Sequence, residues 1–92
     1  MRGLIHMAMA EATQKTEEIY HRFGNSVRTI RRANDMTQAQ LAVLAGMNKT
    51  YLVRIEGGDK NVTLKTAQKL ASALDMELTT LLKGVHVTIE VT

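Results

Sequence analysis

The chain has 92 residues, contains no cysteine and carries a net charge of +3. This length allows one small domain, and the absence of cysteine excludes a disulfide scaffold, thiol catalysis and cysteine-based zinc sites. No apolar run approaches the roughly 20 residues that cross a bilayer and no secretory signal is visible, so we expect a cytoplasmic protein that does not contact membranes.

The basic residues are concentrated in the middle of the sequence. Residues 19–70 contain nine Lys and Arg against three Asp and Glu, a net charge of +6, whereas the two ends together carry −3. A basic segment attracts polyanions such as nucleic acids, because each neutralised phosphate releases condensed counterions. An ordinary solvated surface explains the distribution equally well, so charge alone leaves both interpretations open.

The first predicted helix runs from about residue 16 to residue 34. Within it Ile19, Phe23, Val27 and Ile30 recur every three or four positions, which places them on one face of an amphipathic helix. Residues 1–15 are set apart as an N-terminal extension that derives in part from cloning, because three methionines offer alternative starts.

A second helix is predicted to begin after Thr37. Thr37 and Gln40 have the form of a capping box, in which each side chain accepts a hydrogen bond from a backbone N–H of the other residue. Gly46 predicts the end of this helix, because glycine tolerates a left-handed backbone. The residues expected on its buried side are Leu41, Leu44 and Ala45.

A third helix is predicted from Asn48, a good N-cap, to the Gly57-Gly58 pair. Leu52 and Ile55 are its only strongly apolar members. Most of its surface must therefore face outward, which is unusual for a helix in so small a core.

Two further helices are expected after Thr63, which caps the fourth helix. Apolar residues from Leu64 to Leu74 keep a spacing of three or four, and a short fifth helix is predicted from Glu77 to Lys83. Leu78, Leu81 and Leu82 are expected on the inward side of the fifth helix.

The last stretch changes its period to two, because valine or isoleucine alternates with polar residues from Val85 to Thr92. This alternation predicts a β-strand. An isolated strand leaves its backbone groups unpaired, so we expect it to pair with the same strand of a second copy. The residues expected in this dimer interface are Leu78, Leu81, Leu82, Val85, Val87, Ile89 and Val91.

Residues Gln38 to Gly58 have the spacing of a helix-turn-helix. Ala42 is small where the third helix would cross the second, and Gly46 allows the tight turn between them. Leu52 and Ile55 would anchor the third helix and leave its opposite face free for the major groove of DNA.

This pattern, from Thr37-Gln38-Ala39-Gln40-Leu41-Ala42 to Ile55-Glu56-Gly57-Gly58, resembles the phage-repressor/Cro-like (XRE) helix-turn-helix family. The resemblance covers about residues 23–82, and Lys49-Thr50-Tyr51 with Asn61-Val62-Thr63-Leu64 is similar to restriction–modification controller proteins. It implies an all-α fold, a five-helix lambda-repressor-like domain over residues 16–83. The dimerising β-strand predicted from the alternating pattern in residues 84–92 would follow this domain. The resemblance also implies a sequence-specific DNA-binding transcription regulator.

The resemblance further implies a role for particular side chains. Arg54 would bind guanine with two hydrogen bonds, Lys49 guanine or phosphate, and Thr50 or Val53 a thymine methyl group. Arg31 and Glu56 would form a partly buried ion pair between the first and third helices. Tyr51 would contact DNA or pack against the second helix, with nothing to decide between the two. The residues expected at the DNA backbone are Gln38, Tyr51, Lys60, Asn61, Arg28 and Arg32.

Two features depart from the family pattern. Gly57 replaces the usual basic residue before the closing glycine, and the terminal strand is absent from the plainest repressors and controllers. Some antitoxins of toxin–antitoxin pairs have such a strand after the fifth helix. The resemblance to controllers and that to antitoxins therefore both stay open.

Catalysis finds no support in the sequence. His6, His21 and His86 lie far apart without a metal-ligand partner at helical spacing, and Ser26 and Ser72 have no nearby base. We therefore expect no enzymatic activity, no metal and no cofactor.

The leading hypothesis is a homodimeric repressor that binds a palindromic operator in double-stranded DNA, one third helix per half-site. The alternative is an antitoxin that neutralises a toxin partner and represses its own operon, with the terminal strand added to the partner's sheet. An enzyme-associated regulatory domain that lacks its catalytic part is a third candidate.

Overall fold

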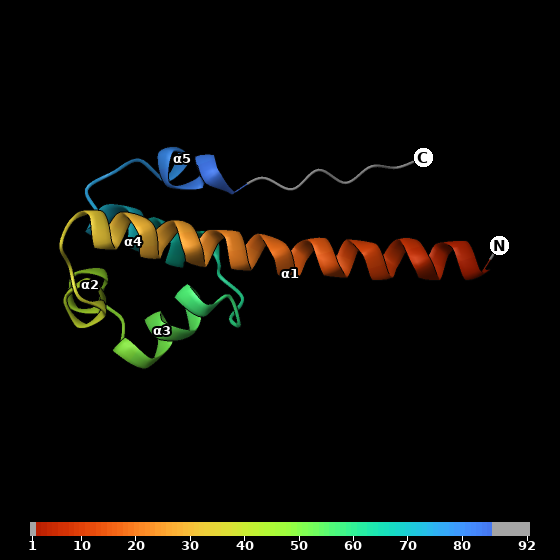
Figure 1. The fold of residues 1–92 in the computed structure, drawn as a ribbon, viewed down its shortest axis with the longest axis horizontal. Helices are drawn as coiled ribbons and strands as arrows, with labels where there is room; N and C mark the ends of the chain where they lie inside the picture. The colour runs from red at the N-terminus through yellow and green to blue at the C-terminus, as the bar shows by residue number, and fades with distance from the viewer. Residues whose placement is uncertain (1, 86–92) are drawn as a thin grey trace.

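The computed structural model describes the backbone of residues 2–85 and the side chains of residues 17–85. In this part of the chain the fold is all-helical (Figure 1). Its elements are α1 (Arg2–Ala33), α2 (Gln38–Ala45), α3 (Lys49–Gly57), α4 (Leu64–Ala73), α5 (Leu78–Leu81) and the 3-10 helix η1 (Leu82–Gly84). The five predicted helices are thus present, and the fifth is shorter than expected because its last turn is η1. The predicted strand beyond Val85 lies outside the described residues.

Helix α1 is much longer than predicted, with 32 residues. It starts at Arg2 instead of about residue 16, and Figure 1 shows its N-terminal half extending beyond the other helices. The predicted start at residue 16 is wrong, because residues 2–15 have the composition of a helix. They contain no proline and only one glycine, and alanine, methionine and glutamate among them favour a helix.

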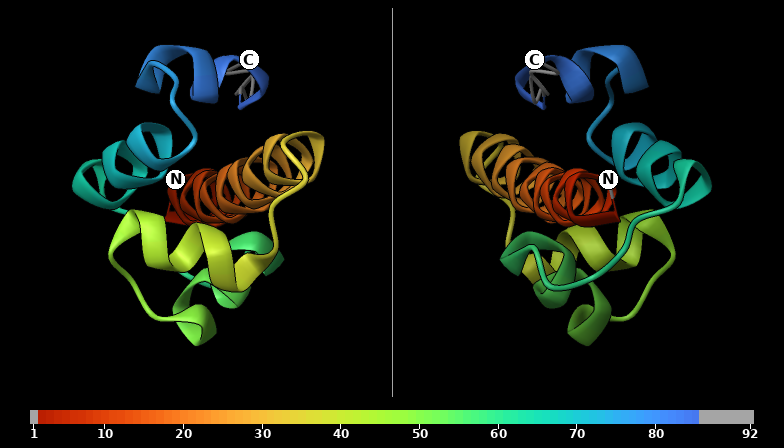
Figure 2. Two further views of the ribbon diagram at one scale, coloured as in Figure 1. Left: turned by 90° about the vertical axis from the view of Figure 1, so that its left-hand side faces the viewer. Right: turned by 90° about the vertical axis from the view of Figure 1, so that its right-hand side faces the viewer.

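The core lies between α1 and the other helices. Figure 2 looks along α1 and shows α2 and α3 on one side of it and α5 on the other, with α4 at the flank. Phe23 and Val27 of α1 are buried as predicted, whereas Ile30 is half-buried and Ile19 is 38% exposed. The fully buried large side chains from the remaining helices are Leu41, Leu52, Ile55, Leu70 and Leu81.

One prediction about burial is wrong. Leu44 of α2 is 63% exposed, and Ala42 is buried in its place together with Leu41 and Ala45. In α4, Leu64 is 75% exposed. A short helix has room for only one narrow buried face, and in α2 the contacts with α3 and α4 select the face with Ala42.

Among the described residues no helix is both long and apolar enough to cross a membrane.

Candidate nucleic-acid interface

The turn between α2 and α3 is built by local hydrogen bonds. Gly46 has left-handed backbone angles (φ 68°, ψ 37°), and the N–H of Met47 donates to the carbonyl of Ala42 at 3.0 Å. Asn48 then caps α3, because its Oδ1 accepts a hydrogen bond from the N–H of Tyr51 at 2.7 Å. The chain therefore breaks between the two helices and restarts in a new direction.

The start of α2 is closed by the predicted capping box. Thr37 Oγ1 accepts from the N–H of Gln40 at 3.1 Å, and Gln40 Oε1 accepts from the N–H of Thr37 at 2.8 Å. This arrangement satisfies two of the backbone groups that have no partner inside the helix. It fixes the first turn of α2, which carries Gln38.

Helix α3 has one buried and one open face. Leu52 and Ile55 are fully buried, and Glu56 is 3% exposed. The four residues predicted to contact bases, Lys49, Thr50, Val53 and Arg54, are all exposed. Their spacing places them on one side of the helix, opposite the anchors. The structure thus presents the four side chains together, on a helix narrow enough to enter a major groove.

The predicted ion pair between Arg31 and Glu56 is present and buried. Arg31 Nε donates to Glu56 Oε2 at 2.7 Å and Arg31 Nη2 to Oε1 at 2.9 Å, with side-chain exposures of 8% and 0%. The hydrogen bond with Glu56 raises the pKa of Arg31. Burial acts to raise the pKa of Glu56, but the hydrogen bonds from Arg31 and Gln38, with the charges of Arg31 and Arg28, outweigh burial and lower it. Both groups are therefore held in their charged forms.

Two residues predicted at the DNA backbone also contact Glu56. Gln38 Nε2 donates to Glu56 Oε1 at 3.2 Å, and Arg28 Nη2 donates to the backbone carbonyl of Glu56 at 3.2 Å. Arg28 Nε lies 3.6 Å from the carboxylate. Sequence patterns did not indicate these contacts, which join α1, α2 and the end of α3. Arg32 is exposed on α1, and the phosphate contacts of all three residues stay predictions.

The loop after α3 carries the other residues predicted at the DNA backbone. Lys60 Nζ lies 5.9 Å from the centre of the Tyr51 ring, a cation–π distance. Tyr51 is half-buried and packs against the core. Its contact with DNA stays a prediction. Asn61 is exposed.

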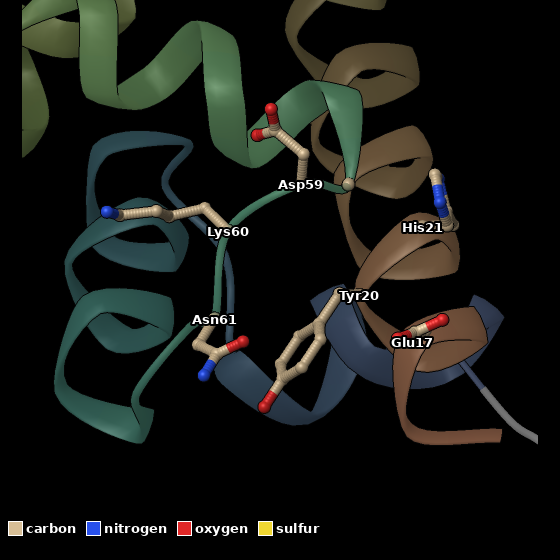
Figure 3. Close-up of a pocket in the computed structure, with 7 residues that line it drawn as sticks. Glu17, Tyr20, His21, Asp59, Lys60 and Asn61 are labelled. Atoms are coloured by element: carbon tan, nitrogen blue, oxygen red, sulfur yellow. The ribbon is translucent and has the colours of Figure 1, made fainter. Parts of the chain in front are cut away.

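A cleft of about 550 Å³ lies between α1 and this loop. Tyr20 and Glu17 of α1 line it together with Asn61 of the loop, and in Figure 3 the amino group of Lys60 points away from Tyr20. His21 packs on Gly58, whose left-handed backbone (φ 77°) ends α3. At this cleft α1 lies beside the loop that follows α3.

Gly24 is a position that supports the site through packing and that the sequence analysis missed. A Cβ atom there would collide with the backbone carbonyl of Ile55 and would lie 2.8 Å from that of Glu56. Only glycine lets α1 approach the C-terminal end of α3 so closely. The signal in the sequence was a glycine inside a strong helical pattern, beside Phe23.

The predicted dimer residues are not equivalent. Leu81 is fully buried in the core of its own chain and has no surface to offer, so its assignment to a dimer interface is wrong. Leu78, Leu82 and Val85 are half-buried and keep some exposed surface. Val87, Ile89 and Val91 lie outside the described residues.

The residues with catalytic or metal-binding chemistry do not converge in the described part. No group of three His, Asp or Glu side chains that could hold a metal ion occurs there. Ser26 donates to the carbonyl of Leu81 at 3.5 Å, which is a structural contact between α1 and α5.

Comparison with known proteins identifies the fold and its family. The helix-turn-helix family profile matches residues 27–81, more than half of the chain. The control protein C.SmaI of Serratia marcescens is 40% identical over 57 residues, which cover 62% of this chain and 68% of that protein. The control protein C.BamHI of Bacillus amyloliquefaciens is 37% identical over 63 residues, 67% of this chain and 78% of that protein.

A solved structure supports the same relationship. The restriction–modification controller protein C.AhdI from Aeromonas hydrophila is 39% identical and superposes with a TM-score of 0.66 over 67% of this chain and 94% of its own. The break at Gly46, the buried anchors of α3 and these relatives agree: the chain belongs to the XRE-type helix-turn-helix family of DNA-binding transcription regulators.

Proposed function

We propose that this protein is a repressor or controller of transcription that binds a palindromic operator as a homodimer, with one α3 in the major groove of each half-site. The observation that carries the proposal is the open face of α3. Lys49, Thr50, Val53 and Arg54 are exposed there, while Leu52 and Ile55 fix the helix from behind.

The chemistry of this face suits a mixed recognition sequence. Arg54 can donate two hydrogen bonds to guanine, and Lys49 can bind guanine or a phosphate. Thr50 and Val53, which is 41% exposed, can contact thymine methyl groups. Four such contacts in each half-site can distinguish a specific operator from random DNA.

Residues on either side of α3 would bind phosphates and so hold α3 in position in the major groove. Gln38 lies in the first turn of α2, where free N–H groups favour a phosphate. Lys60 and Asn61 in the loop after α3, with Arg32 of α1, would bind phosphates on the other side. These contacts position the domain on DNA and make its affinity depend on salt.

Dimerisation would supply the symmetry of the site. Half-site centres of a helix-turn-helix dimer lie about 34–36 Å apart, one turn of DNA. Leu78, Leu82 and Val85 leave exposed apolar surface at the C-terminal end of the domain, next to the alternating segment 86–92. We place the dimer contact there, because pairing two copies would bury this surface and doubles the DNA contacts.

An antitoxin is the second candidate function. Val43 and Leu44 of α2 are 78% and 63% exposed, and with Met36 and Ala39 they line an apolar groove. Exposed apolar surface of this kind favours contact with another protein. The antitoxin and repressor functions are compatible, because the groove residues are not those of the open α3 face.

Selection from a library of random DNA duplexes tests the DNA-binding proposal. We expect enrichment of one palindrome and a steep loss of affinity as salt increases. K49A and R54A should weaken binding to the selected duplex at least tenfold. K69A, which removes a charge from an exposed residue of α4, is the matched control and should change it little. Failure to enrich any sequence, or equal effects of all three variants, would contradict the proposal.

A further inference from the structure

The end of α3 places an acidic residue directly beside Arg54. Gly58 turns the chain with a left-handed backbone, and its N–H donates to the carbonyl of Ile55 at 3.0 Å. The N–H of Asp59 donates to the carbonyl of Arg54 at 3.2 Å. These two hydrogen bonds fix the backbone of Asp59 relative to Arg54 whatever its side chain does.

The carboxylate of Asp59 approaches one particular nitrogen of Arg54. Asp59 Oδ1 lies 3.4 Å from Arg54 Nε, and the two side chains are 66% and 50% exposed. Figure 3 shows the carboxylate on the side of the loop that faces α3. In the described part of the structure the terminal nitrogens Nη1 and Nη2 of Arg54 have no partner, so both remain free to donate.

From this geometry we propose that Asp59 is a positioning residue for Arg54 and increases the selectivity of the protein for its operator. The inference rests on the proposed function, in which Arg54 binds guanine. Asp59 holds Nε and leaves Nη1 and Nη2, the outer edge of the guanidinium, free to donate to a base. Two parallel donors at this edge match the two acceptors of guanine in the major groove.

The ion pair affects both affinities that define the selectivity, the affinity for the operator and the affinity for random DNA. Arg54 is long and flexible, and holding it before binding reduces the conformational entropy that it loses on the operator. On random DNA Arg54 gains no base contact, and the negative charge of Asp59 beside the phosphates disfavours binding. Asp59 therefore strengthens specific binding and weakens nonspecific binding at the same time.

D59N tests the role of the negative charge of Asp59. Asparagine keeps the size of the side chain, and the hydrogen bond from the N–H of residue 59 to the carbonyl of Arg54 does not depend on it. Anisotropy titrations with the selected duplex and with a random duplex, at one salt concentration, give the two affinities. We expect D59N to lose about fivefold on the selected duplex, which corresponds to ~1 kcal/mol. On the random duplex it should gain roughly twofold.

Three further variants separate positioning from a general charge effect. D75N removes the same charge from an exposed residue between α4 and α5 and should leave the ratio of affinities unchanged. In an R54Q background D59N should cause no further loss on the selected duplex, because the side chain that it positions is absent. D59E, which restores the charge, should recover part of the lost selectivity.

Three outcomes would overturn the inference. D59N could leave the ratio unchanged, raise both affinities equally, or lose operator affinity to the same extent in the R54Q background. Each of these presupposes a duplex that the wild type selects. If the wild type selects none, the proposed function itself fails, so the two failures are distinguishable.

Discussion

Replacing Gly24 with alanine should destabilise the protein even though it improves helix propensity. Alanine is favoured over glycine inside a helix by ~1 kcal/mol. The new Cβ atom would collide with the carbonyl of Ile55 and lie 2.8 Å from that of Glu56. Both are backbone atoms that move only if α3 moves, so we take the upper end of the usual overpacking cost, about 3 kcal/mol. The net expectation is a loss of about 2 kcal/mol in the free energy of unfolding.

Gly57 provides the matched control in α3 itself. A Cβ atom at Gly57 would have no other atom within 4 Å. G57A should therefore raise the free energy of unfolding by about 0.5–1 kcal/mol through backbone entropy alone. Urea unfolding followed by circular dichroism measures both variants against the wild type.

The same pair of variants tests the link from packing to DNA binding. G24A displaces the C-terminal end of α3 and should weaken binding to the selected duplex under conditions where the variant is still folded. If G24A is as stable as the wild type, or is stabilised like G57A, the close approach of α1 to α3 is not as the structure shows it and the reasoning is refuted.

Three further predictions concern the core and the buried carboxylate. E56A should cost ~3–5 kcal/mol of stability in thermal or urea unfolding, because it leaves the charge of Arg31 buried without its partner. The lowered pKa of Glu56 stabilises the fold above the ordinary value of 4.5, and this contribution is lost as pH falls through the lower folded-state pKa. Wild-type stability should therefore fall more steeply than that of E56Q on acidification below about pH 4.5, measured as urea midpoints against pH. L41A should cost about 2–5 kcal/mol, whereas L44A should stay within about 0.5 kcal/mol of the wild type; equal losses would contradict the observed orientation of α2.

The helix-turn-helix was predictable because its signals are local. Thr37 with Gln40, Gly46 and Asn48 each satisfy backbone groups within a few residues, so their residue types indicate the conformation without knowledge of the fold. The open face of α3 was predictable because this helix has few apolar residues, and only Leu52 and Ile55 could anchor it. The boundaries of α2 and α3 and the exposed residues of α3 therefore agree with the sequence.

Burial and polar contacts between helices were not predictable in the same way. Ala42 was expected at the crossing of α2 and α3, but Leu44 also fits an amphipathic α2, and only the positions of α3 and α4 show that Leu44 lies outside the buried face. Arg28 and Gln38 look like any polar residues near a DNA surface until α3 ends between them with a buried carboxylate. Such contacts depend on residues 18 to 28 positions apart, for which one sequence carries no pattern.

Glu56 and Gly24 together explain how a helix with so few apolar residues can present a rigid face. Leu52 and Ile55 are separated by less than one turn, so these two anchors alone would allow α3 to pivot about them. The pivot is blocked at the C-terminal end, where Arg31 binds the Glu56 carboxylate and α1 lies against the carbonyls of Ile55 and Glu56 at Gly24. Direct recognition of bases needs donors held to within a fraction of an ångström. A buried ion pair is costly as a source of stability, but here its directional hydrogen bonds fix the rotation of α3, which two leucine-sized contacts cannot do.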